Sequence, residues 1–124
     1  MTQAILVMVG GSLGALSRYG ISLLAVSLFG TNFPWGTLIV NLSGSFLIGL
    51  ALSLAERHLV VGPAARLFFV TGFLGALTTF STYALETVAA ARTGAFRLAF
   101  ANLVLNNLVG LFLVLLGWRV GKFW

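Results

Sequence analysis

Four long apolar runs, separated by short polar breaks, make up most of the chain. The runs extend over about residues 4–29, 35–55, 66–91 and 96–118. The breaks hold turn formers and charges such as Gly30, Pro34 and Glu56. A helical crossing of a bilayer needs about 20 apolar residues, so each run is long enough to span a membrane. We therefore predict that residues 1–124 form a single all-α membrane domain of four transmembrane helices, with both termini on the same side.

Helices fit these runs better than the strands of a β-barrel do, because barrel strands are short and alternate in polarity. Composition agrees, since 60% of the 124 residues are hydrophobic and 7% are charged, against about 25% charged residues in soluble domains. The chain has no cysteine and one histidine, His58, which leaves no thiolate metal site and too few ligands for zinc. It also lacks paired carboxylates, a nucleophile beside a base, and a phosphate-binding glycine loop, so we predict that it is not an enzyme.

The basic residues stand singly at the ends of apolar runs. The formal net charge is +5, but the basic residues form no stripe, so lipid headgroups or an anionic permeant ion fit better as partners than nucleic acid does. On the side of the second loop lie Arg57, Arg66, Arg119 and Lys122, and on the other side lie Arg92 and Arg97. Orientation follows such asymmetry, and this bias is weak, so we expect insertion in both orientations.

Polar side chains at helical spacing interrupt two of the apolar runs. The second run carries, at steps of four, Thr37, Asn41, Ser45 and Gly49, and the fourth carries Asn102, Asn106 and Gly110, with Asn107 beside them. A carboxamide in hydrocarbon costs several kcal/mol unless it faces another helix or water. Hydrogen bonds between helices would explain one such stripe. Two stripes favour a line of neutral N–H donors that solvates an anion without trapping it.

Two charges fall inside apolar runs. Arg18 follows Gly10 and Gly14, whose spacing is typical of close helix contacts. Either Arg18 faces an aqueous vestibule, where it would concentrate anions, or it snorkels to an interface or ends a shorter helix. Glu86 has no acidic companion in the other three runs. Proton-coupled transporters commonly use relays of such groups, so passive flow fits better.

The middle of the third run, GFLGALTTFSTYALE at residues 72–86, resembles the third-helix signature of the Fluc (CrcB) fluoride channels. The stretches GTLIVNLSG at 36–44 and GGSLGALSRY at 10–19 resemble the same family. The resemblance implies a fluoride-selective channel that relieves cytoplasmic fluoride by passive export. It further implies an antiparallel, dual-topology homodimer with two pores, placed in a prokaryotic inner membrane.

Roles for individual residues follow from the same resemblance. The third helix is expected to be broken in its middle, where the backbone carbonyls of Gly75 and Thr78 from both subunits hold a structural sodium ion. The expected pore residues are Asn41, Phe80, Ser81, Thr82, Tyr83, Asn102 and Asn106. The edges of the two rings carry partial positive charge and can face an anion. Tyr83 departs from the family, which usually has phenylalanine there, and its phenol changes both the ring edge and the hydrogen bonding.

Two other functions stay open on the sequence alone. A small multidrug-type, proton-coupled exporter shares four helices and dual topology, but it would need a carboxylate in its first helix, and this chain has none there. A membrane scaffold that transports nothing would use the polar stripes only as packing contacts.

Overall fold

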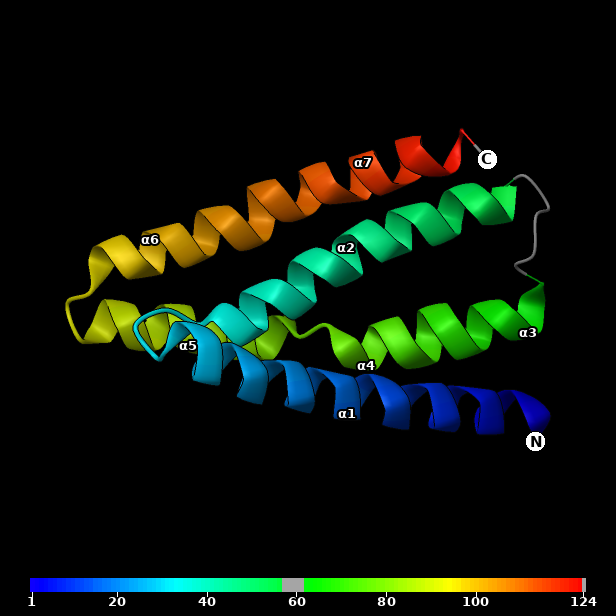
Figure 1. Cartoon of the computed structure of the whole chain (residues 1–124), viewed down its shortest axis with the longest axis horizontal. Coiled ribbons are helices and arrows are strands. Elements are labelled where there is room, and N and C mark those ends of the chain that lie inside the picture. The colour runs from blue at the N-terminus through cyan, green and yellow to red at the C-terminus, as the bar shows by residue number, and fades with distance from the viewer. Residues whose placement is uncertain (57–61, 124) are drawn as a thin grey trace.

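The computed structural model of the chain describes residues 1–56 and 62–123 (Figure 1). Arg57 and His58, which the sequence places in the second loop, lie outside the described residues. The described part is helical and has four stretches long and apolar enough to cross a membrane, namely Thr2–Phe29, Trp35–Glu56, Pro63–Arg92 and Phe96–Gly121. The prediction of an all-α protein with four membrane-spanning helices is confirmed.

The first two spans are single helices, α1 (Thr2–Phe29) and α2 (Trp35–Glu56). The third and fourth are assembled from shorter pieces. The third consists of α3 (Pro63–Arg66), the π-helical η1 (Leu67–Leu74), α4 (Gly75–Leu77) and α5 (Phe80–Arg92); the fourth consists of α6 (Phe96–Val104), the π-helical η2 (Leu105–Val109) and α7 (Gly110–Gly121). All four spans run along the long axis of the molecule, and both termini lie at the same end, as predicted (Figure 1).

Glycines allow α1 to lie directly against η1. A methyl group on Gly10 would overlap the backbone carbonyl of Phe68, and one on Gly14 would overlap that of Phe73. Both glycines are buried. The close helix contact expected from their spacing is confirmed, and in lipid such contacts replace the hydrophobic driving force that packs helices in water.

Glycines also allow α2 to lie directly against α7. A methyl group on Gly49 would overlap the carbonyl of Val114, and one on Gly117 would overlap that of Phe46.

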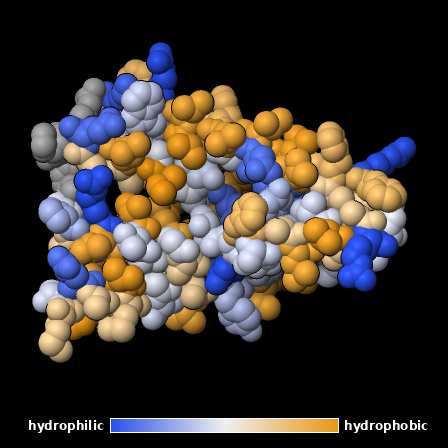
Figure 2. Space-filling view, turned by 180° about the vertical axis from the view of Figure 1, so that it is seen from behind, coloured by the Kyte–Doolittle hydropathy of each residue, from blue (hydrophilic) through white to orange (hydrophobic). Residues whose placement is uncertain are grey.

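The outer surface is largely apolar: Figure 2 shows hydrophobic side chains over much of one face, with strongly hydrophilic ones at both ends and a few near the middle. A surface of this kind suits lipid, and the polar groups near the middle need a separate explanation.

The third span breaks at Thr78 and Thr79, whose backbones are extended, with ψ of 156° and 112°. Helix α5 then restarts at Phe80 with Thr79 as its N-cap, because the Thr79 side chain accepts a hydrogen bond from the amide of Thr82. The third helix is thus broken in its middle, as expected, within residues 72–86. The break divides the span near mid-length, where polar groups of α2 approach it.

Candidate functional site

The break leaves two backbone carbonyls without the amide donors that a continuous helix would supply. The amide of Thr79 donates to Asn41 Oδ1 at 2.8 Å and not to the carbonyl of Gly75. The amide of Thr82 donates to Thr79 Oγ1 at 3.3 Å and not to the carbonyl of Thr78. Gly75 and Thr78 are the positions predicted as sodium ligands. Their freed carbonyls fit a cation that binds backbone oxygen atoms, and the ion itself stays a prediction.

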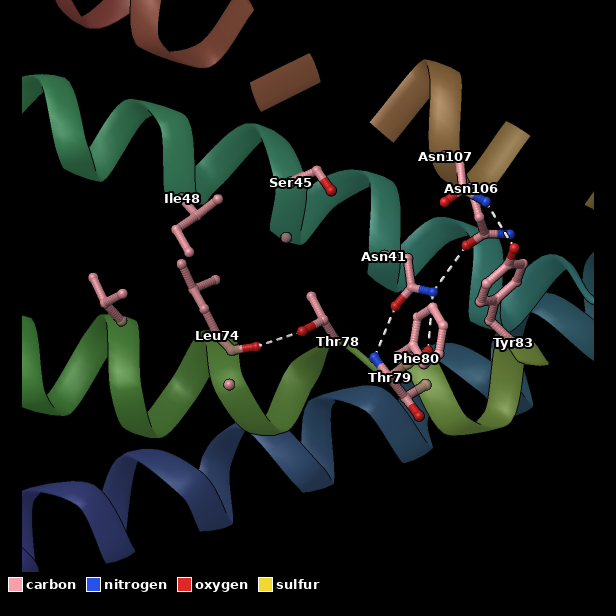
Figure 3. A pocket seen from close by; sticks show the side chains of 13 residues that line it. Asn41, Ser45, Ile48, Leu74, Thr78, Thr79, Phe80, Tyr83, Asn106 and Asn107 are labelled. Carbon is pink, nitrogen blue, oxygen red and sulfur yellow. Dashed lines mark hydrogen bonds between the residues drawn. The ribbon is translucent and has the colours of Figure 1, made fainter. Parts of the chain in front are cut away.

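A cavity of about 350 Å³ opens beside the break (Figure 3). Its walls come from α2, from η1 and α4, from the first turn of α5, and from η2. It brings together four of the predicted pore residues, Asn41, Phe80, Tyr83 and Asn106. None of the described residues that line it carries a formal charge at neutral pH. The cavity is therefore an uncharged space, with polar groups on part of its wall, at the middle of a membrane span.

Ser81 and Thr82 are not among the residues that line this cavity. Their hydroxyls gather around Thr79, whose Oγ1 lies 2.9 Å from Thr82 Oγ1 and 3.4 Å from Ser81 Oγ. Thr82 lines a second cavity, of about 370 Å³, together with Arg18 and Thr37. Helix α1 continues well beyond Arg18, so the alternative of a shorter first helix is wrong. Arg18 is half-buried at the wall of the second cavity.

Asn41 ties α2 to the break and to the fourth span. Its Oδ1 accepts from the Thr79 amide, and its Nδ2 donates to the Thr79 carbonyl at 3.1 Å and to Asn106 Oδ1 at 2.9 Å. The backbone amide of Thr79 can only donate, so it fixes which side of the Asn41 carboxamide is oxygen. Both N–H groups of Asn41 are consequently engaged within the protein.

The hydrogen bonds continue in one direction along the fourth span. Asn106 Nδ2 donates to the carbonyl and to the Oδ1 of Asn102, at 3.0 and 2.8 Å. Fully buried Asn102 donates to Thr87 Oγ1 at 2.9 Å, and Thr87 donates to the Tyr83 carbonyl at 2.8 Å. Asn102 thus lies behind the cavity wall. The predicted line of carboxamides exists, but in this conformation its members bond to one another, so an anion would have to displace one of these bonds.

The two rings at the start of α5 meet edge to face. Their centroids are 5.4 Å apart, with an angle of 66° between the planes. Phe80 is 76% exposed, whereas Tyr83 is 7% exposed. The Tyr83 hydroxyl accepts a hydrogen bond of 2.7 Å from Asn107 Nδ2. The pair predicted from the sequence is therefore in contact, but only one of its rings is fixed by the surrounding subunit.

The sequence of this chain is similar to a known family over most of its length. The family described as "CrcB-like protein, Camphor Resistance (CrcB)" matches residues 5–118. The chain belongs to the CrcB family. Among curated CrcB relatives, one from Shewanella amazonensis is 47% identical over 118 residues and one from Shewanella loihica is 46% identical over 117, each covering 94% of both chains. One from Aeromonas salmonicida is 45% identical over 120 residues, covering 97% of this chain and 96% of the relative. All three bear the name "Fluoride-specific ion channel FluC".

Glu86, the acidic residue in the third span of this CrcB chain, is also held by α2. Thr37 Oγ1 donates to Glu86 Oε1 at 2.8 Å. Glu86 Oε2 is buried and has no hydrogen-bond partner among the described residues. It borders a third cavity, which Thr37 and Thr82 also line. This carboxylate is not among the groups that line the cavity beside the break.

Two residues of the site, Thr79 and Asn107, are not among the pore residues expected from the sequence, although the sequence places Asn107 beside the carboxamide stripe. Thr79 holds Asn41 and caps α5. Threonine is a common N-cap residue, so a threonine directly before the restart of a helix was the available signal. Asn107 bonds to Tyr83, although it directly follows Asn106. Adjacent residues of an α-helix point about 100° apart. The π-helical η2 brings both asparagines to the cavity wall, and apolar periodicity gives no signal for such a turn.

Proposed function

We propose that this chain is a subunit of a fluoride-selective channel that lets fluoride leave the cell passively. Relatives about as long as this chain and about 45% identical to it bear the name of such a channel. The observation that carries the proposal is the uncharged cavity at mid-span, lined by Asn41, Tyr83 and Asn106. Neutral donors bind an anion weakly enough to release it again, as conduction requires.

A proton-coupled exporter accounts for the same features less well. The chain has two acidic residues. Glu56 ends α2 and accepts a hydrogen bond from Trp118, and Glu86 lies in the third span and accepts one from Thr37. Since these are the two acidic residues, α1 carries no carboxylate. A scaffold would need no cavity at the middle of the spans. Both rivals also lack support from the relatives, which are named as channels.

Release of ions from proteoliposomes tests the proposal. Vesicles loaded with fluoride or with chloride, and supplied with a potassium carrier to balance charge, are followed with ion-selective electrodes. We expect fluoride to leave rapidly and chloride to leave no faster than from protein-free vesicles. Equal release of the two anions would contradict selectivity, and fluoride release that depends on a proton gradient would favour an exporter.

We further propose that the functional unit is an antiparallel homodimer with two pores. Phe80 lies at the cavity but is mostly exposed in the single subunit, so a second copy would complete the wall around it. Asn41, on the same wall, is held by its own subunit. The weak asymmetry of basic residues supports insertion in both orientations.

Single cysteines test this arrangement cleanly, because the chain has none of its own. Gly62 is exposed with open space around it, and Ala95 is exposed in the loop at the opposite end. We expect Gly62→Cys and Ala95→Cys each to be labelled by an impermeant maleimide from both sides of sealed membranes. Labelling of each cysteine from one side only, in a preparation that conducts, would refute the antiparallel pair.

A structural sodium ion at the break is the third part of the proposal. The carbonyls of Gly75 and Thr78, freed of their helical donors, would hold it together with the same carbonyls of the second copy. Bound there, the ion would neutralise carbonyl dipoles at a depth where water is scarce. We expect prolonged dialysis against a sodium-free buffer to lower the melting temperature of the dimer, and sodium to restore it. A melting temperature indifferent to sodium would contradict the site.

A further inference from the structure

The side chains that line the cavity beside the break offer few free hydrogen atoms to an anion. Both N–H groups of Asn41 and of Asn106 are engaged within the subunit. The hydroxyl of Thr78 donates to a carbonyl one turn earlier at 3.0 Å, and that of Thr79 donates to a hydroxyl of α5 at 2.9 Å. An anion in this cavity must therefore break an existing bond or find another donor.

Among the side chains that line the cavity, hydroxyls supply the remaining donors. Among the described residues that line the cavity, Ser45 and Tyr83 have side-chain hydroxyls with no acceptor in the described part of the subunit. Ser45 is half-buried on α2, and its side chain makes none of the hydrogen bonds found there. Tyr83, in contrast, is held firmly. Of the two, Tyr83 is the donor whose position the fold determines.

Asn107 fixes the direction of the Tyr83 hydroxyl. Its Nδ2 donates to the carbonyl of Leu103 at 2.8 Å and to the Tyr83 oxygen at 2.7 Å. A carboxamide turned the other way would set its oxygen against the Leu103 carbonyl, so the nitrogen must lie on this side. The phenol oxygen is therefore an acceptor toward Asn107, and its own hydrogen is left to point elsewhere.

The Tyr83 ring has little freedom to move. Its side chain is almost fully buried and packs edge to face against Phe80. The π-helical η2 keeps Asn107 beside Asn106 on the same wall (Figure 3). A donor held in place before an ion arrives binds it without the cost of being ordered at that moment.

We propose that the Tyr83 hydroxyl, held by Asn107, donates its hydrogen to the permeating anion. Tyr83 is then an anion-binding residue and Asn107 is a positioning residue that acts through it. The inference rests on the proposed channel function. Hydrogen bonds to an ion are shorter and stronger than neutral ones, and attraction grows as the separation falls, so such a donor favours the smallest halide.

A double-mutant cycle on fluoride release tests both roles. The concentration of fluoride that gives half-maximal release is measured for the parent, Tyr83→Phe, Asn107→Leu and the double variant. We expect Tyr83→Phe to raise this half-maximal concentration about tenfold, which corresponds to the loss of one hydrogen bond to a charged group. Asn107→Leu should raise it less, and the double variant should match Tyr83→Phe. An unchanged value for Tyr83→Phe would overturn the inference, and additive effects would overturn the positioning role of Asn107.

Tyrosine absorbance gives a second readout that needs no conduction. Fluoride should shift the tyrosine difference spectrum of the purified parent, because the phenol gains an acceptor. Tyr83→Phe should abolish the shift, although Tyr19, the other of the two tyrosines, remains. A parent that binds fluoride in this way but releases none would sink the proposed channel and leave the Tyr83 site standing. A shift that survives in Tyr83→Phe would refute the site.

Discussion

Replacing Asn41 with aspartate places a negative charge on the wall of the cavity with little change in shape. The new side chain keeps the hydrogen bond from the Thr79 amide, which lies 2.8 Å from Oδ1. Its second oxygen, however, replaces a nitrogen that lies 3.1 Å from the Thr79 carbonyl and 2.9 Å from Asn106 Oδ1. Two attractive contacts therefore become repulsive. We expect Asn41→Asp to lose almost all fluoride release.

The size of the loss follows from the charge. Two like charges about 4 Å apart repel by about 4 kcal/mol at an effective dielectric constant of about 20. That energy lowers occupancy of the cavity by fluoride roughly a thousandfold. The fold is destabilised as well, because a charged aspartate at the centre of a membrane helix costs about 2.5–3.5 kcal/mol. Folding must therefore be checked before a loss of conduction is assigned to repulsion of the anion.

Asn41→Leu is the control without a charge: it removes the two hydrogen bonds that Asn41→Asp loses, and also the bond from the Thr79 amide. Release from proteoliposomes is measured for both variants across a pH series, after confirming that each elutes like the parent in gel filtration. Asn41→Leu should retain clearly more release than Asn41→Asp at neutral pH. Parental release by Asn41→Asp, at a pH where its carboxylate is shown to be ionised, would place Asn41 off the anion path.

Three further substitutions probe packing, the exposed ring and the helix ends. Gly14→Ala should cost about 1–3 kcal/mol in a denaturation series, because its methyl group overlaps the backbone of η1, while Gly20→Ala, with open space around it, should cost almost nothing. Phe80→Ile should disturb the packing of its own subunit little, since this ring is largely exposed there, yet should lower fluoride release severely by removing an aromatic edge. Trp118→Phe loses the bond of 3.2 Å to Glu56 at an exposed end and should lower stability by less than about 1 kcal/mol.

Hydropathy predicts the architecture because lipid imposes one strong demand on every span. Each crossing must be long, apolar and internally hydrogen-bonded, so the positions of the four spans and the shared side of the termini follow from run lengths. The break also leaves a local signal, since Gly75, Thr78 and Thr79 interrupt an otherwise apolar run. Spacing further predicts the close contact of Gly10 and Gly14 with a neighbouring helix.

The direction of each hydrogen bond depends on tertiary placement and leaves no mark in the pattern. Spacing identified Asn41 and Asn106 as polar groups but not the engagement of their N–H groups with protein partners. The burial of Tyr83 and the exposure of Phe80 depend on how α5 packs against the rest of the subunit. Asn107 reaches Tyr83 through a π-helical turn, which no periodic template of apolar residues predicts.

The voltage at which current stops tests the central claim most directly. The protein is placed in a planar bilayer with a tenfold gradient of fluoride and equal chloride on both sides. For a passive channel selective for fluoride, the zero-current voltage should lie about 59 mV from zero, with the sign set by fluoride, and should not move when a pH gradient is added. A zero-current voltage near zero, or one that follows the gradient of protons or of chloride, would contradict the account.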